Sequence, residues 1–107
     1  MGEAVIHRDD RGRVVGVALR DAEASTAAGA SACSFLAAVT ASLSEYLHVP
    51  VTGVEGIDAE ITVDRSDTHL DREIDAVLET LVIGLKMLER DYPADLVVHD
   101  AAIGVEV

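Results

Sequence analysis

Residues 68–91 carry one continuous apolar stripe, and this stripe constrains the fold more than any other feature of the chain. Its members recur at the spacing of an α-helix and are Ile74, Val77, Leu78, Leu81, Leu85 and Leu88. Asp67 or Thr68 can cap the start of such a helix, and Pro93 forbids its continuation. We therefore predict a long helix over residues 68–91 that buries one side against a partner layer.

Short runs of β-type sequence can supply that partner layer. They cover residues 4–7, 14–19, 59–65 and 96–100, and a last run covers residues 103–107. The first two runs predict a hairpin around a polar turn. A second helix is predicted over residues 30–47, with Ser31 as its N-cap, and residues 48–58 are expected to form a loop or an irregular strand. The order β-β-α-β-α-β predicts an α+β fold, in which two helices cover one face of a mixed sheet.

Length and composition limit the classes of protein to which the chain can belong. A chain of 107 residues predicts a single domain over residues 1–107. Apolar residues make up 50% of the chain but aromatic residues only 3%, so the core must be aliphatic. No apolar run approaches the ~20 residues of a membrane helix, and the first residues lack the apolar stretch of a signal peptide. We therefore expect a cytoplasmic protein without a membrane partner.

The net charge of −12 bears on the choice of partner. Phosphates repel such a chain, and no cluster of lysine and arginine offsets the repulsion, so we expect no nucleic-acid partner. An acidic surface suits either solubility alone or the binding of a basic protein or peptide. The sequence leaves these two alternatives open.

Residues 19–39 hold the candidate catalytic groups and read LRDAEASTAAGASACSFLAAV. They contain Cys33, the chain's one cysteine, which excludes an internal disulfide and a cysteine-based zinc cluster. A thiol in the first turn of a helix is stabilised as thiolate by exposed N–H groups and the helix dipole. Ser34 is a second candidate nucleophile, and Asp21 or Glu23 is a candidate base. No histidine lies in this stretch.

Residues 81–98, LVIGLKMLERDYPADLVV, resemble the C-terminal helix and strand of the ribosomal-processing cysteine protease family, which has the YsxB-like fold. The positions that match its helix-ending pattern are Gly84, Leu85, Lys86, Leu88, Tyr92 and Pro93. The predicted hairpin, the loop with Gly29 and the small-residue helix match as well, so the resemblance spans nearly the whole chain. It implies a YsxB-like fold, a homodimer, and cleavage of an N-terminal extension from a bacterial ribosomal protein.

The resemblance fails at the catalytic pair. The family carries a Gly-His motif after its second strand, and this histidine is the base for the cysteine in the following helix. Aligning on Cys33 puts Asp21 at the histidine position. Aligning on Gly29 puts Ser34 at the cysteine position and Ala22 at the histidine position. Because neither alignment recovers a histidine, the resemblance implies a divergent member in which the Cys–His pair is lost.

The four histidines, His7, His48, His69 and His99, are spread along the chain without metal-ligand spacing. The chain also lacks a phosphate-cradling glycine loop, so we expect no metal and no cofactor. His7 or His99 could still approach Cys33 across the sheet, because distance in sequence does not limit distance in space. A histidine within hydrogen-bond reach of the thiol would restore a catalytic pair.

Three functional hypotheses follow from these residues. The first is a non-catalytic homologue of the ribosomal-processing cysteine protease, which acts through partner binding or dimer assembly. The second is an active thiol hydrolase that uses Cys33 with a substitute base. The third is a small-molecule enzyme that uses Asp21 or Glu23 as a carboxylate base in the same pocket. The sequence does not separate the last two hypotheses.

Overall fold

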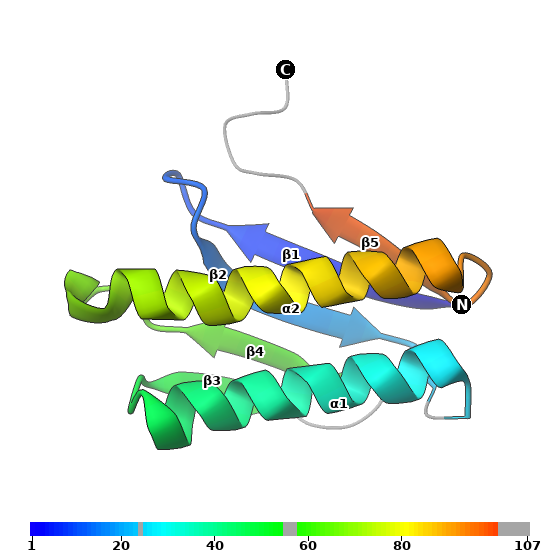
Figure 1. The fold of residues 1–107 in the computed structure, drawn as a ribbon, viewed down its shortest axis with the longest axis horizontal. Coiled ribbons are helices and arrows are strands. Elements are labelled where there is room, and N and C mark those ends of the chain that lie inside the picture. Colours follow the sequence, from blue (N-terminus) through cyan, green and yellow to red (C-terminus); the bar gives the residue numbers. More distant parts are fainter. Residues whose placement is uncertain (24, 55–57, 101–107) are drawn as a thin grey trace.

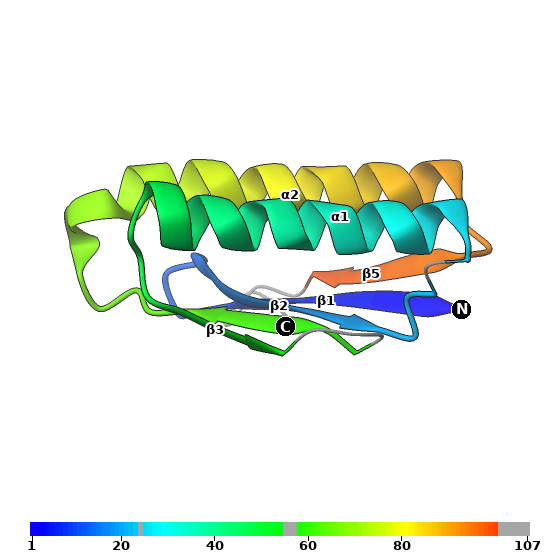
Figure 2. The same ribbon diagram turned by 90° about the horizontal axis from the view of Figure 1, so that it is seen from below.

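A computed structural model describes residues 1–23, 25–54 and 58–100 of the chain. In these residues, five strands form one sheet. The two long helices lie over the sheet (Figure 1), and both lie on the same side of it (Figure 2). The predicted α+β fold with two helices on one face is therefore confirmed. The run predicted at residues 103–107 lies outside the described residues.

The N-terminal hairpin forms where the sequence predicts it. Strands β1 (Gly2–Arg8) and β2 (Val14–Arg20) pair antiparallel. Asp9 shapes the turn between them, because its carboxylate accepts hydrogen bonds from the backbone N–H groups of Arg11 and Arg13 at 3.0 and 2.9 Å. Gly12 takes a left-handed conformation with φ of 80°, which glycine adopts without strain.

The sheet has the strand order β3-β4-β2-β1-β5. Strand β4 (Glu60–Val63) pairs antiparallel with β2, whereas β5 (Leu96–Asp100) pairs parallel with β1, so the sheet is mixed as predicted. Strand β3 (Val51–Val54) pairs antiparallel with β4 at one edge. The segment expected to be a loop or an irregular strand therefore contains a regular strand, because β4 supplies its hydrogen-bond partners.

Helix α1 (Ala27–Ala41) begins earlier than the sequence predicts, and Ser31 is not its N-cap. The cap is Thr26, whose hydroxyl accepts a hydrogen bond from the N–H of Gly29 at 2.9 Å. Gly29 packs on the carbonyl oxygen of Glu23 so closely that a Cβ atom would overlap it. The helix continues into a π-helical turn, η1 (Ser42–Tyr46).

Helix α2 (Asp71–Asp91) follows a short 3-10 turn, η2 (Thr68–Leu70). The predicted cap is confirmed, since the Asp67 carboxylate accepts a hydrogen bond from the N–H of His69 at 2.9 Å. Of the predicted stripe, Val77 is partly buried and the other members are buried, namely Ile74, Leu78, Leu81, Leu85 and Leu88. Val82, which is not part of the predicted stripe, is buried as well. Burial of this stripe fixes α2 on the sheet.

The core is aliphatic, as the composition predicts. Its largest fully buried side chains include Leu19, Leu43, Ile74, Leu78, Leu85 and Leu96. All three aromatic residues lie at the surface instead: Phe35 is 38% exposed, Tyr46 80% and Tyr92 40%. The two helices and the inner face of the sheet therefore meet through branched aliphatic side chains.

The continuous helical segment Ala27–Tyr46 is, by length and composition, long and apolar enough to cross a membrane, with a mean hydropathy of 1.4. The expectation that no apolar run approaches this length is therefore wrong. The core helix of a soluble protein meets the same criterion. In this fold the segment packs against the rest of the domain through Ala28, Ala32, Leu36 and Leu43, which are buried.

Two groups of ion pairs connect α2 to the rest of the domain. In the first, Arg8 of β1 contacts Glu79 of α2 at 2.7 Å and Asp100 of β5 at 2.8 Å, and Lys86 contacts Asp100 at 2.9 Å. The hydrogen bond from Arg8, reinforced by Lys86, lowers the pKa of Asp100 to about 2. In the second, the buried Arg65 contacts Asp75 of α2 at 2.6 Å.

Candidate functional site

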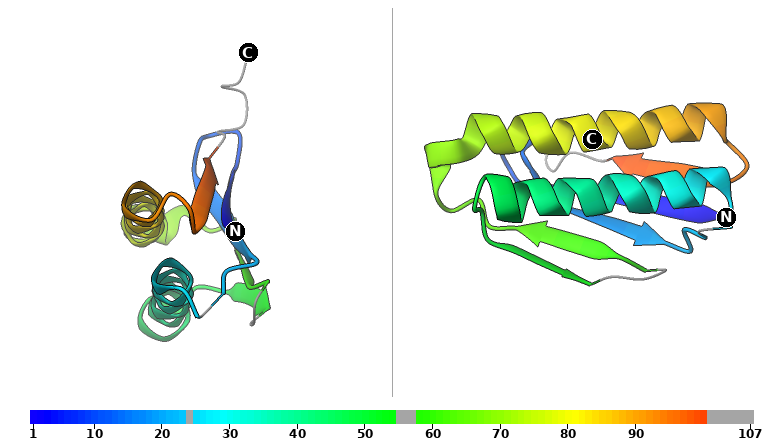
Figure 3. Two further views of the ribbon diagram at one scale, coloured as in Figure 1. Left: turned by 90° about the vertical axis from the view of Figure 1, so that its right-hand side faces the viewer. Right: turned by 60° about the horizontal axis from the view of Figure 1, so that its bottom comes forward.

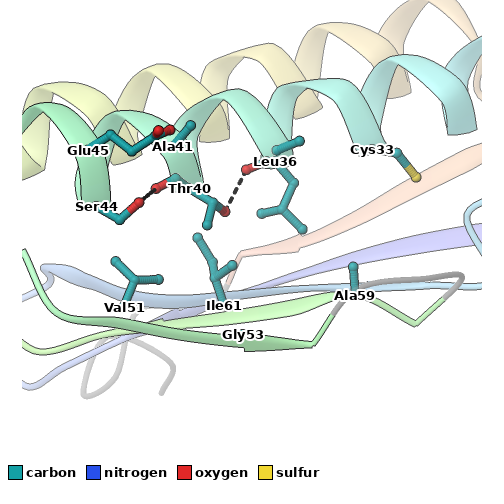
Figure 4. Close-up of a pocket in the computed structure, with 11 residues that line it drawn as sticks. Cys33, Leu36, Thr40, Ala41, Ser44, Glu45, Val51, Gly53, Ala59 and Ile61 are labelled. Carbon is teal, nitrogen blue, oxygen red and sulfur yellow. Dashed lines mark hydrogen bonds between the residues drawn. The ribbon is translucent and has the colours of Figure 1, made fainter.

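A groove of about 580 Å³ runs between α1 and the strands β3 and β4 (Figure 4). Its walls are formed by Cys33, Leu36, Ala37, Thr40, Ala41, Ser44 and Glu45 of the helical segment, by Val51, Gly53 and Ile61 of the strands, and by Ala59, which directly precedes β4. The helical residues recur three or four positions apart, and the strand residues alternate, so each set faces one side of its element. The groove arises where these two periodic faces meet.

The hydroxyl groups of the groove donate their protons within the helix. Thr40 donates to the carbonyl oxygen of Leu36 at 2.7 Å, and Ser44 donates to that of Thr40 at 3.0 Å (Figure 4). A hydroxyl that has used its proton in this way can only accept a further hydrogen bond. Glu45, an exposed carboxylate nearby, is also an acceptor when ionised. The polar side of the groove therefore favours a ligand that donates.

Cys33 lies at one end of the groove and is half-buried. It is the seventh residue of α1, so the prediction that it lies in the first turn is wrong. The free N–H groups that would stabilise a thiolate belong to the first turn, and the influence of the dipole falls off beyond it. The thiol faces the backbone carbonyl oxygen of Ala22 at 3.8 Å, a weak hydrogen bond.

The candidate carboxylates line a different hollow. Asp21 and Glu23 border a space of about 140 Å³ at the start of β1, and Cys33 is not part of its lining. Asp21 takes a left-handed conformation with φ of 53°, and its N–H donates to Asp58 at 3.2 Å. Ser34 is exposed and lines neither space. Of the candidates that lie together in sequence, only Cys33 lines the groove.

Two of the histidines lie on the far face of the sheet. Ala4 and Ile6 of β1 are buried under the helices, so His7 points to the opposite side. His99 of β5 is exposed, and its ring nitrogen lies 2.9 Å from a carboxylate oxygen of Glu3. Figure 3 shows that the sheet separates this face from α1, which carries Cys33.

The other two histidines also lie outside the groove. His48 borders a hollow of about 170 Å³ beside η2, and His69 belongs to η2 itself. All four histidines are among the described residues, and none of them lines the groove at Cys33. Within residues 1–23, 25–54 and 58–100, no three side chains of the metal-ligating types lie close enough together to hold a metal ion.

Most of the groove is not predicted by the sequence. Thr40, Ser44, Glu45 and the strand residue Val51 are not among the candidates, because a nucleophile is expected at the start of a helix and these residues lie far from it. One signal was available, since Cys33, Thr40 and Ser44 share one helical face at spacings of seven and four. The strand side could not be found in this way, because β3 is defined by its pairing with β4.

Comparison by sequence gives no relative, since neither a protein-family model nor a curated protein matches the chain. Comparison by structure gives several. An essential ribosomal processing protease, Prp from S. aureus, in complex with a substrate peptide, superposes with a TM-score of 0.80 and 18% identity, over 92% of this chain and 98% of that chain. The same enzyme with a covalently linked product peptide gives a TM-score of 0.78 and 20% identity, with the same coverage.

A further similar structure is SMU.848 from Streptococcus mutans. It superposes with a TM-score of 0.76 and 15% identity, over 92% of this chain and 96% of that chain. The chain therefore has the YsxB-like fold of the ribosomal processing proteases, and the resemblance stated from its residues is confirmed for the fold. At identities this low, the likeness concerns the fold and leaves the activity open.

Proposed function

We propose that this protein is a non-catalytic homologue of the ribosomal-processing cysteine proteases, and that it binds a peptide in the groove between α1 and β3. The observation that carries the proposal is the environment of Cys33. Its thiol lies at the end of a groove of ligand size, but it faces the backbone carbonyl of Ala22, and all four histidines lie elsewhere. The groove can therefore bind a peptide, but it holds no histidine that could act as the base for peptide cleavage by Cys33.

Cleavage of a peptide by a thiol needs a group that accepts the thiol proton and returns it to the leaving amine. Loss of such a group typically removes ~10²–10⁴-fold in rate. Asp21 and Glu23 border the other hollow, and neither of them lines the groove at Cys33. A carboxylate is also a poor proton donor near neutral pH. These points support binding over cleavage.

The charge of the molecule favours a basic peptide as the ligand. The chain carries a net charge of −12, and Glu45 lies on the wall of the groove. The solved relative with the same fold was crystallised with a substrate peptide, and we transfer peptide binding, but not cleavage, to this chain. We further propose that the protein works in the cytoplasm as a homodimer.

Peptide binding and peptide cleavage can be measured on the same sample. The probe is a fluorescent basic peptide whose sequence follows a ribosomal N-terminal extension, and the control is an acidic peptide of equal length. We expect the basic peptide to raise the fluorescence anisotropy, to stay intact by mass spectrometry, and to bind Cys33→Ala as well as the unmodified protein. The absence of any binding would overturn the proposal.

An active thiol hydrolase is the second candidate, and one observation favours it: the half-buried thiol of Cys33 opens into the groove. If the basic peptide is cleaved, and if Cys33→Ala stops cleavage while the control Ser34→Ala does not, this candidate replaces the first. The third hypothesis, a small-molecule enzyme based on Asp21 or Glu23, has less support. The hollow that these residues border, about 140 Å³, is smaller than the ~300–1,000 Å³ usual for ligand sites.

A further inference from the structure

The two edges of the sheet differ in how they are protected. At the β5 edge, the backbone N–H of Val98 donates to the carboxylate of Glu89, which reaches over from α2, at 2.9 Å. A side chain thus occupies a backbone donor that would otherwise be free to pair with another strand. The β5 edge is therefore partly closed by the protein itself.

The β3 edge faces outward with free backbone groups. The carbonyl oxygen of Pro50 accepts from the N–H of Asp64 at 3.2 Å, and the strand pairing continues with Thr52 opposite Thr62. Because hydrogen-bonded residues alternate along an antiparallel pair, Val51 and Gly53 turn their N–H and C=O groups away from β4. In the part of the chain that the structure describes, no loop or cap hydrogen bond reaches these groups.

The same two residues form the floor of the groove. Val51 and Gly53 line it from β3, opposite Thr40 and Ser44 of the helical segment (Figure 4). Residues directly opposite each other in paired strands point to the same face of the sheet. A strand added to the β3 edge would therefore place every second side chain beside the groove.

We propose that the ligand is an extended peptide that pairs with β3 as an additional strand. Every second side chain lies in the groove, and one of these is a lysine or arginine whose charge is met by Glu45. This inference rests on the proposed function and specifies how the peptide is held. Backbone hydrogen bonds to an exposed edge supply affinity in such complexes, and pockets for alternate side chains supply specificity.

The polar groups of the groove favour a basic side chain on the bound peptide. Thr40 and Ser44 have used their hydroxyl protons and offer acceptors, and Glu45 adds a negative charge. Lysine and arginine are donors with the matching sign of charge.

The test uses a labelled heptapeptide in which leucine, valine and lysine alternate with threonine, measured by fluorescence anisotropy. Single backbone N-methyl groups are placed at each position in turn, because each removes one amide donor and leaves the side chain in place. If the peptide adds a strand, N-methylation should weaken binding by about tenfold at one alternating set of positions and have little effect at the other.

A matched pair of protein variants tests the charge. Glu45→Gln should weaken binding of the lysine peptide severalfold and leave a norleucine version of the peptide unaffected. Glu60→Gln is the control, since Glu60 is also an exposed glutamate, but it lies on the far face of β4. Increasing salt should reduce the difference between the two peptides, because exposed charges are screened.

The outcomes separate this inference from the function on which it rests. Equal effects of N-methylation at all positions, with binding otherwise intact, would overturn the added strand and leave groove binding in place. No binding of either this peptide or the ribosomal one would overturn both. Peptide binding that is lost as the protein concentration rises would show that a second copy takes the edge, which would also overturn the inference.

Discussion

Replacing Asp100 by asparagine tests whether the ion cluster around Arg8 stabilises the fold. Asp100 ends β5 and connects it to β1 through Arg8 and to α2 through Lys86. Its pKa is lowered from 3.8 to about 2, first by the hydrogen bond from Arg8. At about 1.4 kcal/mol per pKa unit, this difference amounts to roughly 2 kcal/mol of stability. The Asp100 side chain is only 11% exposed, so solvent screens it weakly, but Arg8 keeps Glu79 as a partner when Asp100 is removed; we therefore expect a cost of about 1–2 kcal/mol.

The dependence on pH follows from the sign of this change. A carboxylate with a lowered folded-state pKa binds protons more weakly in the folded than in the unfolded chain. Its contribution is therefore fully present above the unfolded value near pH 4 and is lost as the pH falls toward 2. Asp100→Asn should lower the free energy of unfolding by about 1–2 kcal/mol at pH 7, and this difference should shrink between pH 4 and 2.

The assay is urea unfolding followed by far-ultraviolet circular dichroism, at several values from pH 7 to pH 2. Asp10→Asn is the control, because Asp10 is an exposed carboxylate in the β1–β2 turn. It removes the same charge from a strongly acidic chain, so it corrects for general repulsion. The reasoning is refuted if Asp100→Asn and Asp10→Asn have equal stability at pH 7, or if their difference does not change with pH.

Three further outcomes are expected. Leu85→Ala should lower the free energy of unfolding by about 2–5 kcal/mol because Leu85 is fully buried, whereas Ile83→Ala, 59% exposed, should cost under about 1 kcal/mol; an equal cost would contradict the described core. Gly29→Ala should lower the melting temperature, because its Cβ would overlap the Glu23 carbonyl; an unchanged value would contradict the described helix start. Analytical ultracentrifugation at tens of micromolar should show a dimer, and a strict monomer would count against the proposed assembly.

The sequence by itself determined the elements with a strong local signal. The apolar stripe predicted for residues 68–91 forms the buried face of α2. A helix with one continuous apolar face is most stable when it packs that face against the sheet. The hairpin formed as predicted, since Asp9 and Gly12 specify the turn over a few residues. The scarcity of aromatic residues correctly predicted an aliphatic core. The resemblance at residues 81–98 led to the fold that the structural comparison then showed.

The helix boundaries and the short strand β3 could be determined only from the tertiary structure. Thr26 and Ser31 are both good caps, and the choice between them depends on how Gly29 packs against Glu23, which is a contact across the loop. Strand β3 holds only four residues, and the neighbouring proline and glycines resemble a loop. Its identity as a strand depends on pairing with β4, which no local pattern encodes.

The candidate site shows the same division. The sequence placed Asp21, Glu23 and Cys33 close together along the chain and raised His7 and His99 as possible partners of the thiol. Only the folded chain decided that the carboxylates border a different hollow and that both histidines lie beyond the sheet. Alternation along β1 separates His7 from Ile6, but which face the helices cover is a property of the whole domain. Local sequence therefore determined which groups the protein has, and non-local packing decided which of them meet.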